Sequence, residues 1–396
     1  MKKIGIILGA VLLLIIAFQL NKNEALDSNT TTKDLEDHDK TFYSQTEDTI
    51  VDVLYATDRG LDAKAELEER YTIERSELKY GVTQVSVPKT HTFGWVERPS
   101  NFLIFKGKEK IGHHVVITKL EALELEKFRE ILSLKLSNVD ESDILIFVHG
   151  FNVTFAESIR QTAQIAYDLH FLGVPLTYSW PSQGNPKLTK YMTDEESVKY
   201  TNSHLVTFLK EVIAHKGNAN IHILAHSMGT RAVANAVKEI ALTHDTPQFK
   251  NVILAAPDID ADVFKVNLYP YLKKATEKIT IYASSTDKAL GISKMLHGWK
   301  KRLGSGGENI TVLNDIVMVD ATGIDTSFLG HSYFAEKEIL VNDLRAVVQK
   351  SLPPQQRPNL LERIKHKMFY WKFDIPEVKN TVDNLELLKA DDEDDF

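Results

Sequence analysis

The segment around Ser227 holds the side chain best suited to chemistry. Residues 220–225 form a short apolar run typical of a buried strand, and helical spacing begins directly after the serine, over 228–242. Small residues flank it at Ala225 and Gly229. A serine in such a strand-to-helix turn has its hydroxyl lifted above the sheet, where the N–H groups of the following helix point. The spacing therefore predicts a nucleophilic serine, with Ala225 replacing the more usual glycine.

A serine that attacks a carbonyl carbon also needs N–H donors for the oxyanion that forms. One donor is expected from the residue after the nucleophile, Met228, and the other from a loop after an earlier strand. The run over residues 143–148 is such a strand, and His149-Gly150-Phe151 follows it. Gly150 permits the backbone twist, so the Phe151 N–H is the expected second donor. His149 and Gly150 should border the substrate pocket.

The serine also requires a base, and the base requires an acid that orients it. In this type of site the acid and then the histidine follow the serine along the chain. Asp258 and Asp287 each follow an expected strand. The later position is the usual one, so Asp287 is favoured and Asp258 is the alternative, otherwise expected to shape the pocket or cap the next helix. Trp180 follows another strand end and should border the same pocket.

Three histidines follow Asp287. His297 comes only ten residues later, inside an expected helix, and His366 lies in the C-terminal segment. His331 follows the last expected core strand and its loop, so it is the predicted base. A Ser227–His331–Asp287 triad needs no metal ion and no organic cofactor.

The elements that must position these residues indicate an α/β architecture. Short apolar runs fit strands buried on both faces of a parallel sheet, and segments with helical spacing alternate with them. Added strands are expected before them, at 49–57, 80–88, 101–106 and 113–119. The apolar runs begin at Asp143, Val174, Asn220, Asn251, Lys278 and Asp315, and helices are expected over 156–172, 195–215, 228–242 and 336–352.

Several motifs occur in a fixed order. They are TyrAlaThrAspArg from Tyr55, HisGlyPheAsn from His149, SerTrpProSer from Ser179, AlaHisSerMetGly from Ala225, AlaAlaProAspIleAsp from Ala255, SerSerThrAspLysAlaLeu from Ser284 and GlyHisSerTyr from Gly330. Together they resemble the bacterial α/β hydrolases of unknown function, an esterase- or lipase-like family, over about residues 51–352. The resemblance implies an α/β-hydrolase fold, with a mostly parallel central sheet and helices on both faces. It also implies a Ser227, Asp287 and His331 triad, and it supplies no substrate.

The N-terminus carries a membrane signal. Lys2 and Lys3 precede an uninterrupted run of apolar residues and glycine over 4–18. A small-residue cleavage site is missing, so residues 1–20 are expected to be an uncleaved anchor rather than a cleaved signal peptide. The positive end stays inside, which predicts a cell-envelope protein, anchored in the inner membrane or released to the periplasm or exterior.

The remaining segments follow from composition. Residues 21–45 are polar and read as a flexible tether, 46–352 as the hydrolase domain, and 353–396 as an appendage with an acidic tail. Within the appendage, residues 360–373 are basic and aromatic, which fits a helix packed on the core or a contact with a membrane surface.

Charge and cysteine content exclude several classes. The net charge of -8 includes five acidic residues at 391–395, and no basic stripe marks a nucleic-acid-binding protein. The chain has no cysteine, which excludes disulfides, thiolate metal sites and a cysteine nucleophile. The expected partner is a small-molecule or lipid acyl ester. The alternatives are an amidase, a peptidase or an acyltransferase on the same triad, and a non-catalytic, membrane-anchored binding protein.

Overall fold

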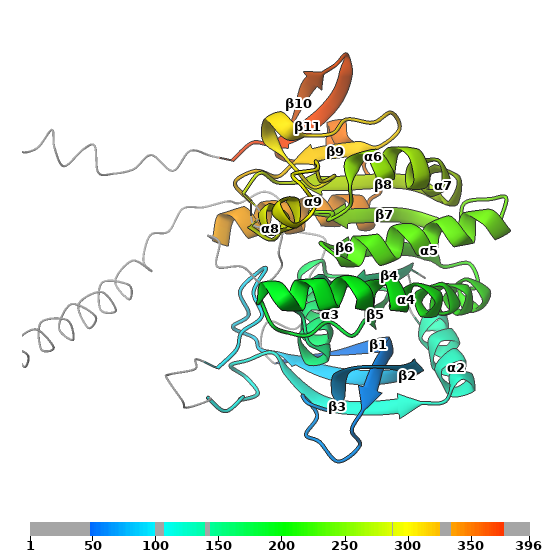
Figure 1. Cartoon of the computed structure of the whole chain (residues 1–396). Coiled ribbons are helices and arrows are strands. Elements are labelled where there is room, and N and C mark those ends of the chain that lie inside the picture. The colour runs from blue at the N-terminus through cyan, green and yellow to red at the C-terminus, as the bar shows by residue number, and fades with distance from the viewer. Residues whose placement is uncertain (1–47, 100–106, 139–142, 287, 325–333, 376–396) are drawn as a thin grey trace, which may run out of the picture. The chain divides into compact units, whose positions relative to one another are not determined.

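One sheet joins the strands of the part that the computed structural model describes, namely residues 48–99, 107–138, 143–286, 288–324 and 334–375 (Figure 1). Its strands are β1 (Thr49–Leu61), β2 (Tyr71–Val87), β3 (Val116–Leu123), β4 (Asp143–Val148), β5 (Val174–Ser179), β6 (Asn220–His226), β7 (Phe249–Ala255), β8 (Thr276–Ala283), β9 (Val317–Asp320), β10 (Leu360–Lys365) and β11 (Met368–Phe373). The spatial order of these eleven strands is β10-β11-β9-β8-β7-β6-β4-β5-β1-β2-β3.

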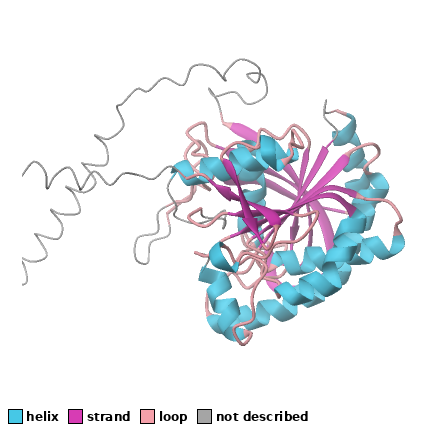
Figure 2. Ribbon diagram, turned by 90° about the horizontal axis from the view of Figure 1, so that it is seen from above, coloured by secondary structure: helices cyan, strands magenta, loops and turns pink. Residues whose placement is uncertain are grey.

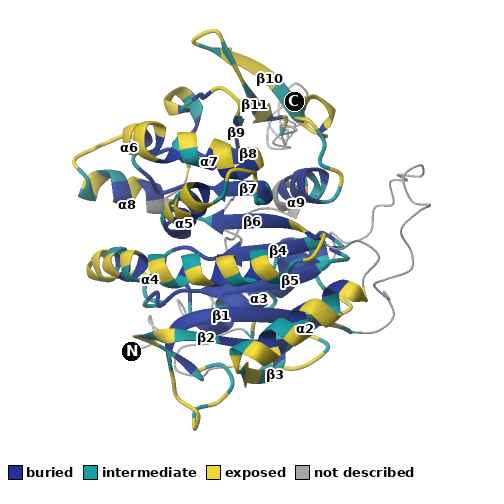
Figure 3. Ribbon diagram, turned by 90° about the vertical axis from the view of Figure 1, so that its right-hand side faces the viewer, coloured by how far each residue is buried: buried dark blue, intermediate teal, exposed yellow. Residues whose placement is uncertain are grey.

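The centre of the sheet is parallel, as the apolar runs predict. Strands β1, β5, β4, β6, β7, β8 and β9 pair with one another in parallel, and β1 pairs antiparallel with β2 on its other side. In β4, five of the six residues are buried. The strand is paired on both sides, with Ile146 opposite Leu176 of β5 and Ile223 of β6. Such strands cannot face water on either side, which is why their sequences are continuously apolar. Figure 3 shows these strands as buried.

Helices cover both faces of the sheet (Figure 2). One buried cluster contains side chains of α2, α4, α5 and α7, and a second contains side chains of α3 and α9. The helices are α2 (Leu125–Ser137), α3 (Phe155–Asp168), α4 (Leu188–His215), α5 (Gly229–Thr243), α6 (Ala261–Val263), the π-helix η1 (Phe264–Leu268), α7 (Tyr269–Ala275), α8 (Lys288–Leu296), the 3₁₀ turn η2 (Gly307–Asn309), α9 (Phe334–Val348) and the 3₁₀ turn η3 (Pro354–Gln356).

Local chemistry sets the start of α3, the helix that follows β4. The Thr154 hydroxyl accepts a hydrogen bond from the Glu157 backbone N–H at 3.2 Å, and the Glu157 carboxylate accepts one from the Thr154 N–H at 2.7 Å. This reciprocal pair satisfies two donors that the first helical turn would otherwise leave without partners. These two hydrogen bonds therefore fix Thr154 as the residue at which the loop after β4 ends and α3 begins.

The fold class predicted from the sequence is confirmed, including the added strands before the parallel core. Three details differ. Helix α2 was not expected, and α4 begins at Leu188 rather than at Glu195. The helix considered for residues 360–373 is wrong, because β10 and β11 form a hairpin there whose β11 pairs with β9.

Other expectations fall outside the described residues. These are the strand at 101–106, the N-terminal anchor, the tether up to residue 45 and the acidic tail. Across the described ranges, no helix is both long enough and apolar enough to cross a bilayer.

Candidate active site

Ser227 stands on a sharp turn between β6 and α5. Its φ angle is 49°, in the left-handed region that non-glycine residues seldom occupy. The backbone around it is tied down, since the Ser227 N–H donates to the Ala255 carbonyl at 2.9 Å and the Ser227 carbonyl accepts from the Thr230 hydroxyl at 2.6 Å. Only 4% of the residue is exposed. This is the local geometry expected of a nucleophile elbow.

The loop after β4 lies directly against this turn. A Cβ atom on Gly150 would stand 2.9 Å from the Ser227 Cβ and 2.8 Å from Nδ1 of His226. A Cβ atom on Gly229 would stand 2.2 Å from the His149 carbonyl oxygen. Glycine at both positions is thus what lets the loop, the serine and the first turn of α5 come together.

The two N–H groups predicted to hold an oxyanion belong to Phe151 and Met228. Phe151 is in the loop that packs on the serine, and Met228 directly follows the serine. Within the described ranges, neither N–H donates a hydrogen bond. No part of the described chain therefore occupies these two donors, as the predicted oxyanion hole requires.

Contacts between His149 and Trp180 hold this loop in place. Their rings are stacked, with centroids 5.0 Å apart, and the Trp180 indole N–H donates to the His149 carbonyl oxygen at 2.7 Å. Burial, together with the nearby Arg59 guanidinium, holds the pKa of His149 well below its usual range. His149 is therefore neutral near pH 7, and its contacts fix the conformation of the loop.

Asp258 is the centre of a buried ion-pair network rather than a free carboxylate. It accepts hydrogen bonds from Arg302 at 2.9 Å and from Arg231 at 3.0 Å, and also from the hydroxyls of Tyr191 and Ser293. Burial raises the pKa of the Asp258 carboxyl, but the two guanidinium groups and the hydroxyl donors outweigh burial and leave this pKa lowered. Both carboxylate oxygens have partners, so Asp258 is poorly placed to orient a histidine.

The network adjoins the oxyanion loop, as we name residues 149–151 for their predicted role. The Phe151 and Tyr191 rings make an edge contact at 5.3 Å, and the Asp258 N–H donates to the Ser227 carbonyl at 3.3 Å. Sequence reasoning missed Arg231 and Arg302. Arg231 lies one helical turn after the serine, a spacing that could have signalled it, whereas Arg302 comes from a distant loop that no local pattern connects to the serine.

Asp287 and His331 lie outside the described residues. The strands that lead to them are described: β8 ends four residues before Asp287, and β9 ends eleven residues before His331. In the sheet, β9 pairs with β8, β8 with β7, and β7 with β6. Because these strands are parallel, all of them end at the same edge as Ser227.

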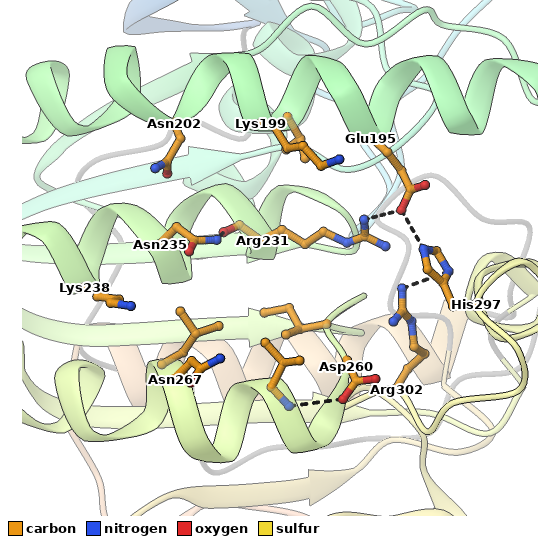
Figure 4. Close-up of a pocket in the computed structure, with 14 residues that line it drawn as sticks. Glu195, Lys199, Asn202, Arg231, Asn235, Lys238, Asp260, Asn267, His297 and Arg302 are labelled. Carbon is orange, nitrogen blue, oxygen red and sulfur yellow. Dashed lines mark hydrogen bonds and ion pairs between the residues drawn. The ribbon is translucent and has the colours of Figure 1, made fainter.

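A groove of about 520 Å³ opens beside the Asp258 network (Figure 4). Its walls come from α4, α5 and the segment of α6 and η1. At one end Glu195 contacts both the Arg231 guanidinium and His297, whose Nε2 lies 2.9 Å from the Glu195 carboxylate. The rest of the lining combines polar side chains with the apolar Val198, Ile259, Val263 and Leu268; the polar ones include Asn202, Asn235, Asn267, Lys199 and Lys238. Among the described residues, no cluster of three or more His, Asp or Glu side chains could hold a metal ion.

The family can now be stated. A family model described as "Alpha/beta hydrolase of unknown function (DUF900)" matches residues 124–349. The chain belongs to this family. The resemblance found in the sequence motifs is thereby confirmed, and the matched range contains the elbow, the oxyanion loop and the predicted acid and base.

Comparisons with other proteins add little about the activity of this alpha/beta hydrolase. No curated protein is detectably similar to it in sequence. Among solved structures, an esterase from Rhizomucor miehei matches at 10% identity with a TM-score of 0.34, covering 85% of this chain and 95% of that one. MenH from S. aureus matches at 15% identity with a TM-score of 0.29, covering 54% of this chain and 93% of that one. Likenesses this weak carry no information about substrate.

Proposed function

We propose that this alpha/beta hydrolase is a serine hydrolase that cleaves carboxylic esters. The observation that carries the proposal is the left-handed turn at Ser227, with Gly150 of the oxyanion loop packed against the serine Cβ. A strained serine beside two backbone N–H groups that have no partner among the described residues is the arrangement that acyl transfer needs.

In the proposed reaction, the Ser227 Oγ attacks the ester carbonyl carbon while His331 takes the hydroxyl proton. Asp287 holds the imidazole in the correct orientation, and the Phe151 and Met228 N–H groups bind the oxyanion. The tetrahedral intermediate collapses when His331 gives its proton to the leaving alcohol. Water then hydrolyses the acyl-enzyme by the same two steps, and Ser227 regains its proton.

The groove beside the Asp258 network does not select the acyl group, because Ser227, Phe151 and Met228 are not among its lining residues. Short p-nitrophenyl esters are therefore the first substrates to test, since they report attack by Ser227 without requiring a site for a long acyl chain.

The test is hydrolysis of these esters by the full chain and by Ser227→Ala. Alanine tolerates φ 49° no better than serine does, so the variant should fold with unchanged stability and lose hydrolysis. Ser203→Ala, which removes an exposed hydroxyl on α4, is the matched control and should keep full activity. Unchanged turnover in Ser227→Ala would overturn the nucleophile. A panel of ester, amide and phospholipid substrates separates an esterase from an amidase or a lipase.

The triad partners and the location need their own tests. His331→Ala and Asp287→Asn should each lose most of the activity, and full activity in His331→Ala would remove that residue from the mechanism. We also propose that the chain acts in the cell envelope, held there by residues 1–20. Recovery of the protein in the membrane fraction, and its release when those residues are removed, would support this location.

A further inference from the structure

The β10–β11 hairpin extends past the sheet to which it belongs (Figures 1 and 3). Only Trp371 and Lys372 of β11 pair with β9, and the residues before them continue beyond that strand. The hairpin is closed by a two-residue turn, His366-Lys367. In the outer half of the hairpin, β10 and β11 therefore pair only with each other.

One face of this hairpin changes from buried to exposed along its length. Trp371 and Phe373 lie on it near the sheet and are only 6% and 2% exposed. Ile364 and Phe369 stand directly opposite each other near the turn and are 68% and 57% exposed. Cross-strand partners share a face, and so do residues two apart in a strand. The apolar face thus continues into solvent, where no described residue covers it.

The opposite face is held against the body of the protein. The Lys365 ammonium group donates to the carbonyl oxygens of Glu308 at 2.6 Å and Ile310 at 3.0 Å. Met368 and Tyr370 pack against the buried cluster on that side of the sheet. The hairpin is therefore a supported projection with a fixed apolar face.

The turn and its surroundings are unusually basic. His366 and Lys367 have φ angles of 51° and 63°, a pair of left-handed conformations for which Asn-Gly is the common sequence. Neither residue is suited to that backbone, and such strain is retained mainly where side chains serve a purpose. Residues 360–373 carry four cationic side chains, Arg363, Lys365, Lys367 and Lys372, against one carboxylate, Glu362, in a chain whose net charge is -8. Lys365 is held by the protein's own carbonyl groups, and the other three cations are exposed.

We propose that this hairpin docks the hydrolase on an anionic lipid bilayer. Ile364 and Phe369 enter the boundary between headgroups and acyl chains, and the exposed Arg363 and Lys367 of the same strand and turn contact the lipid phosphate and carboxylate groups. Large exposed apolar side chains with arginine and lysine close by are the chemistry that such an interface selects. An acidic polypeptide is less well matched, because the exposed pair stands at a projecting tip rather than in a groove.

The experiment uses the full chain, which contains no cysteine. His366→Cys is labelled with a polarity-sensitive fluorophore and mixed with vesicles of phosphatidylcholine, with or without phosphatidylserine. We expect a blue shift with the anionic vesicles and quenching by lipids that carry bromine on their acyl chains. Asp245→Cys, at a fully exposed side chain on another loop, is the control and should not respond. An anchor elsewhere in the chain would tether both probes without moving residue 366 into lipid.

Ile364→Ser with Phe369→Ser, in the His366→Cys chain, should raise the lipid concentration for half-maximal response by roughly tenfold or more. Both side chains are exposed, so the thermal midpoint should not change. The proposal fails if the probe at 366 stays unshifted with anionic vesicles, or if neutral vesicles act equally well. It also fails if the two serines leave the response intact, or if soluble poly-glutamate produces the same shift.

Discussion

Gly150→Ala tests the contact between the oxyanion loop and Ser227, the proposed nucleophile. The new methyl carbon would lie 2.8 Å from His226 Nδ1, and it must retreat to at least 3.4 Å for an ordinary contact, a movement of about 0.6 Å. A donor at a typical 2.9 Å would then sit near 3.5 Å, beyond useful hydrogen-bond distance. Loss of one oxyanion donor costs about 2.7–4 kcal/mol of transition-state stabilisation, or about 10²–10³ in kcat.

The assay is steady-state hydrolysis of a short p-nitrophenyl ester, with labelling of Ser227 by a fluorophosphonate as a second measurement. We expect kcat to fall and KM to change little, because the lost interaction forms only in the transition state. Gly291→Ala is the control, since its Cβ would meet nothing within 4 Å. Wild-type kcat/KM in Gly150→Ala would refute the assignment of this loop to the oxyanion hole.

Three further predictions concern the support of the site and of the fold. Asp258→Asn should lower the free energy of unfolding by about 3–5 kcal/mol in urea titrations, because it leaves Arg302 buried without its counter-charge; a loss below about 1 kcal/mol, as for an exposed pair, would contradict a buried network. Trp180→Phe keeps the stack on His149 but removes the donor to its carbonyl, so stability should fall by about 1–3 kcal/mol and kcat severalfold; unchanged kcat would mean that the loop does not depend on this bond. Burial lowers the pKa of His91, but hydrogen bonds to Asp168 and Glu97 raise it to about 9. Its stabilisation, on the order of 3 kcal/mol, should be complete below about pH 6.5 and disappear as pH rises through about 9. Urea titrations between pH 6 and pH 10 on wild type and His91→Gln check this, and parallel curves for the two proteins would contradict it.

The parallel core and the elbow could be predicted because local sequence determines them. The apolar run of β4 is buried on both faces, and Ser227 sits between a strand and a helix whose periodicities differ clearly. The packing of the loop after β4 against the serine was predictable for a similar reason, since a glycine follows the end of a buried strand. The role of this loop in holding an oxyanion stays a prediction. In each case the signal lies within about ten residues.

The ion-pair network and the hairpin could not be predicted in the same way. Asp258 meets Arg302 across 44 residues and Tyr191 across 67, and no periodic pattern records such contacts. The hairpin was not predicted because its turn is His366-Lys367, which lacks the Asn or Gly that usually marks a two-residue turn. Its alternating burial becomes visible only once β11 is paired with β9.

Under the proposed function, the left-handed backbone at Ser227 sets activity against stability within one residue. Holding a non-glycine residue at φ 49° costs about 1–3 kcal/mol, a cost that the surrounding hydrogen bonds offset. A glycine at this position would relieve the strain and would also remove the proposed nucleophile. Ser227→Gly should therefore be at least as stable as the wild type and should have lost hydrolysis, so that a gain in stability and a loss of activity come from the same substitution.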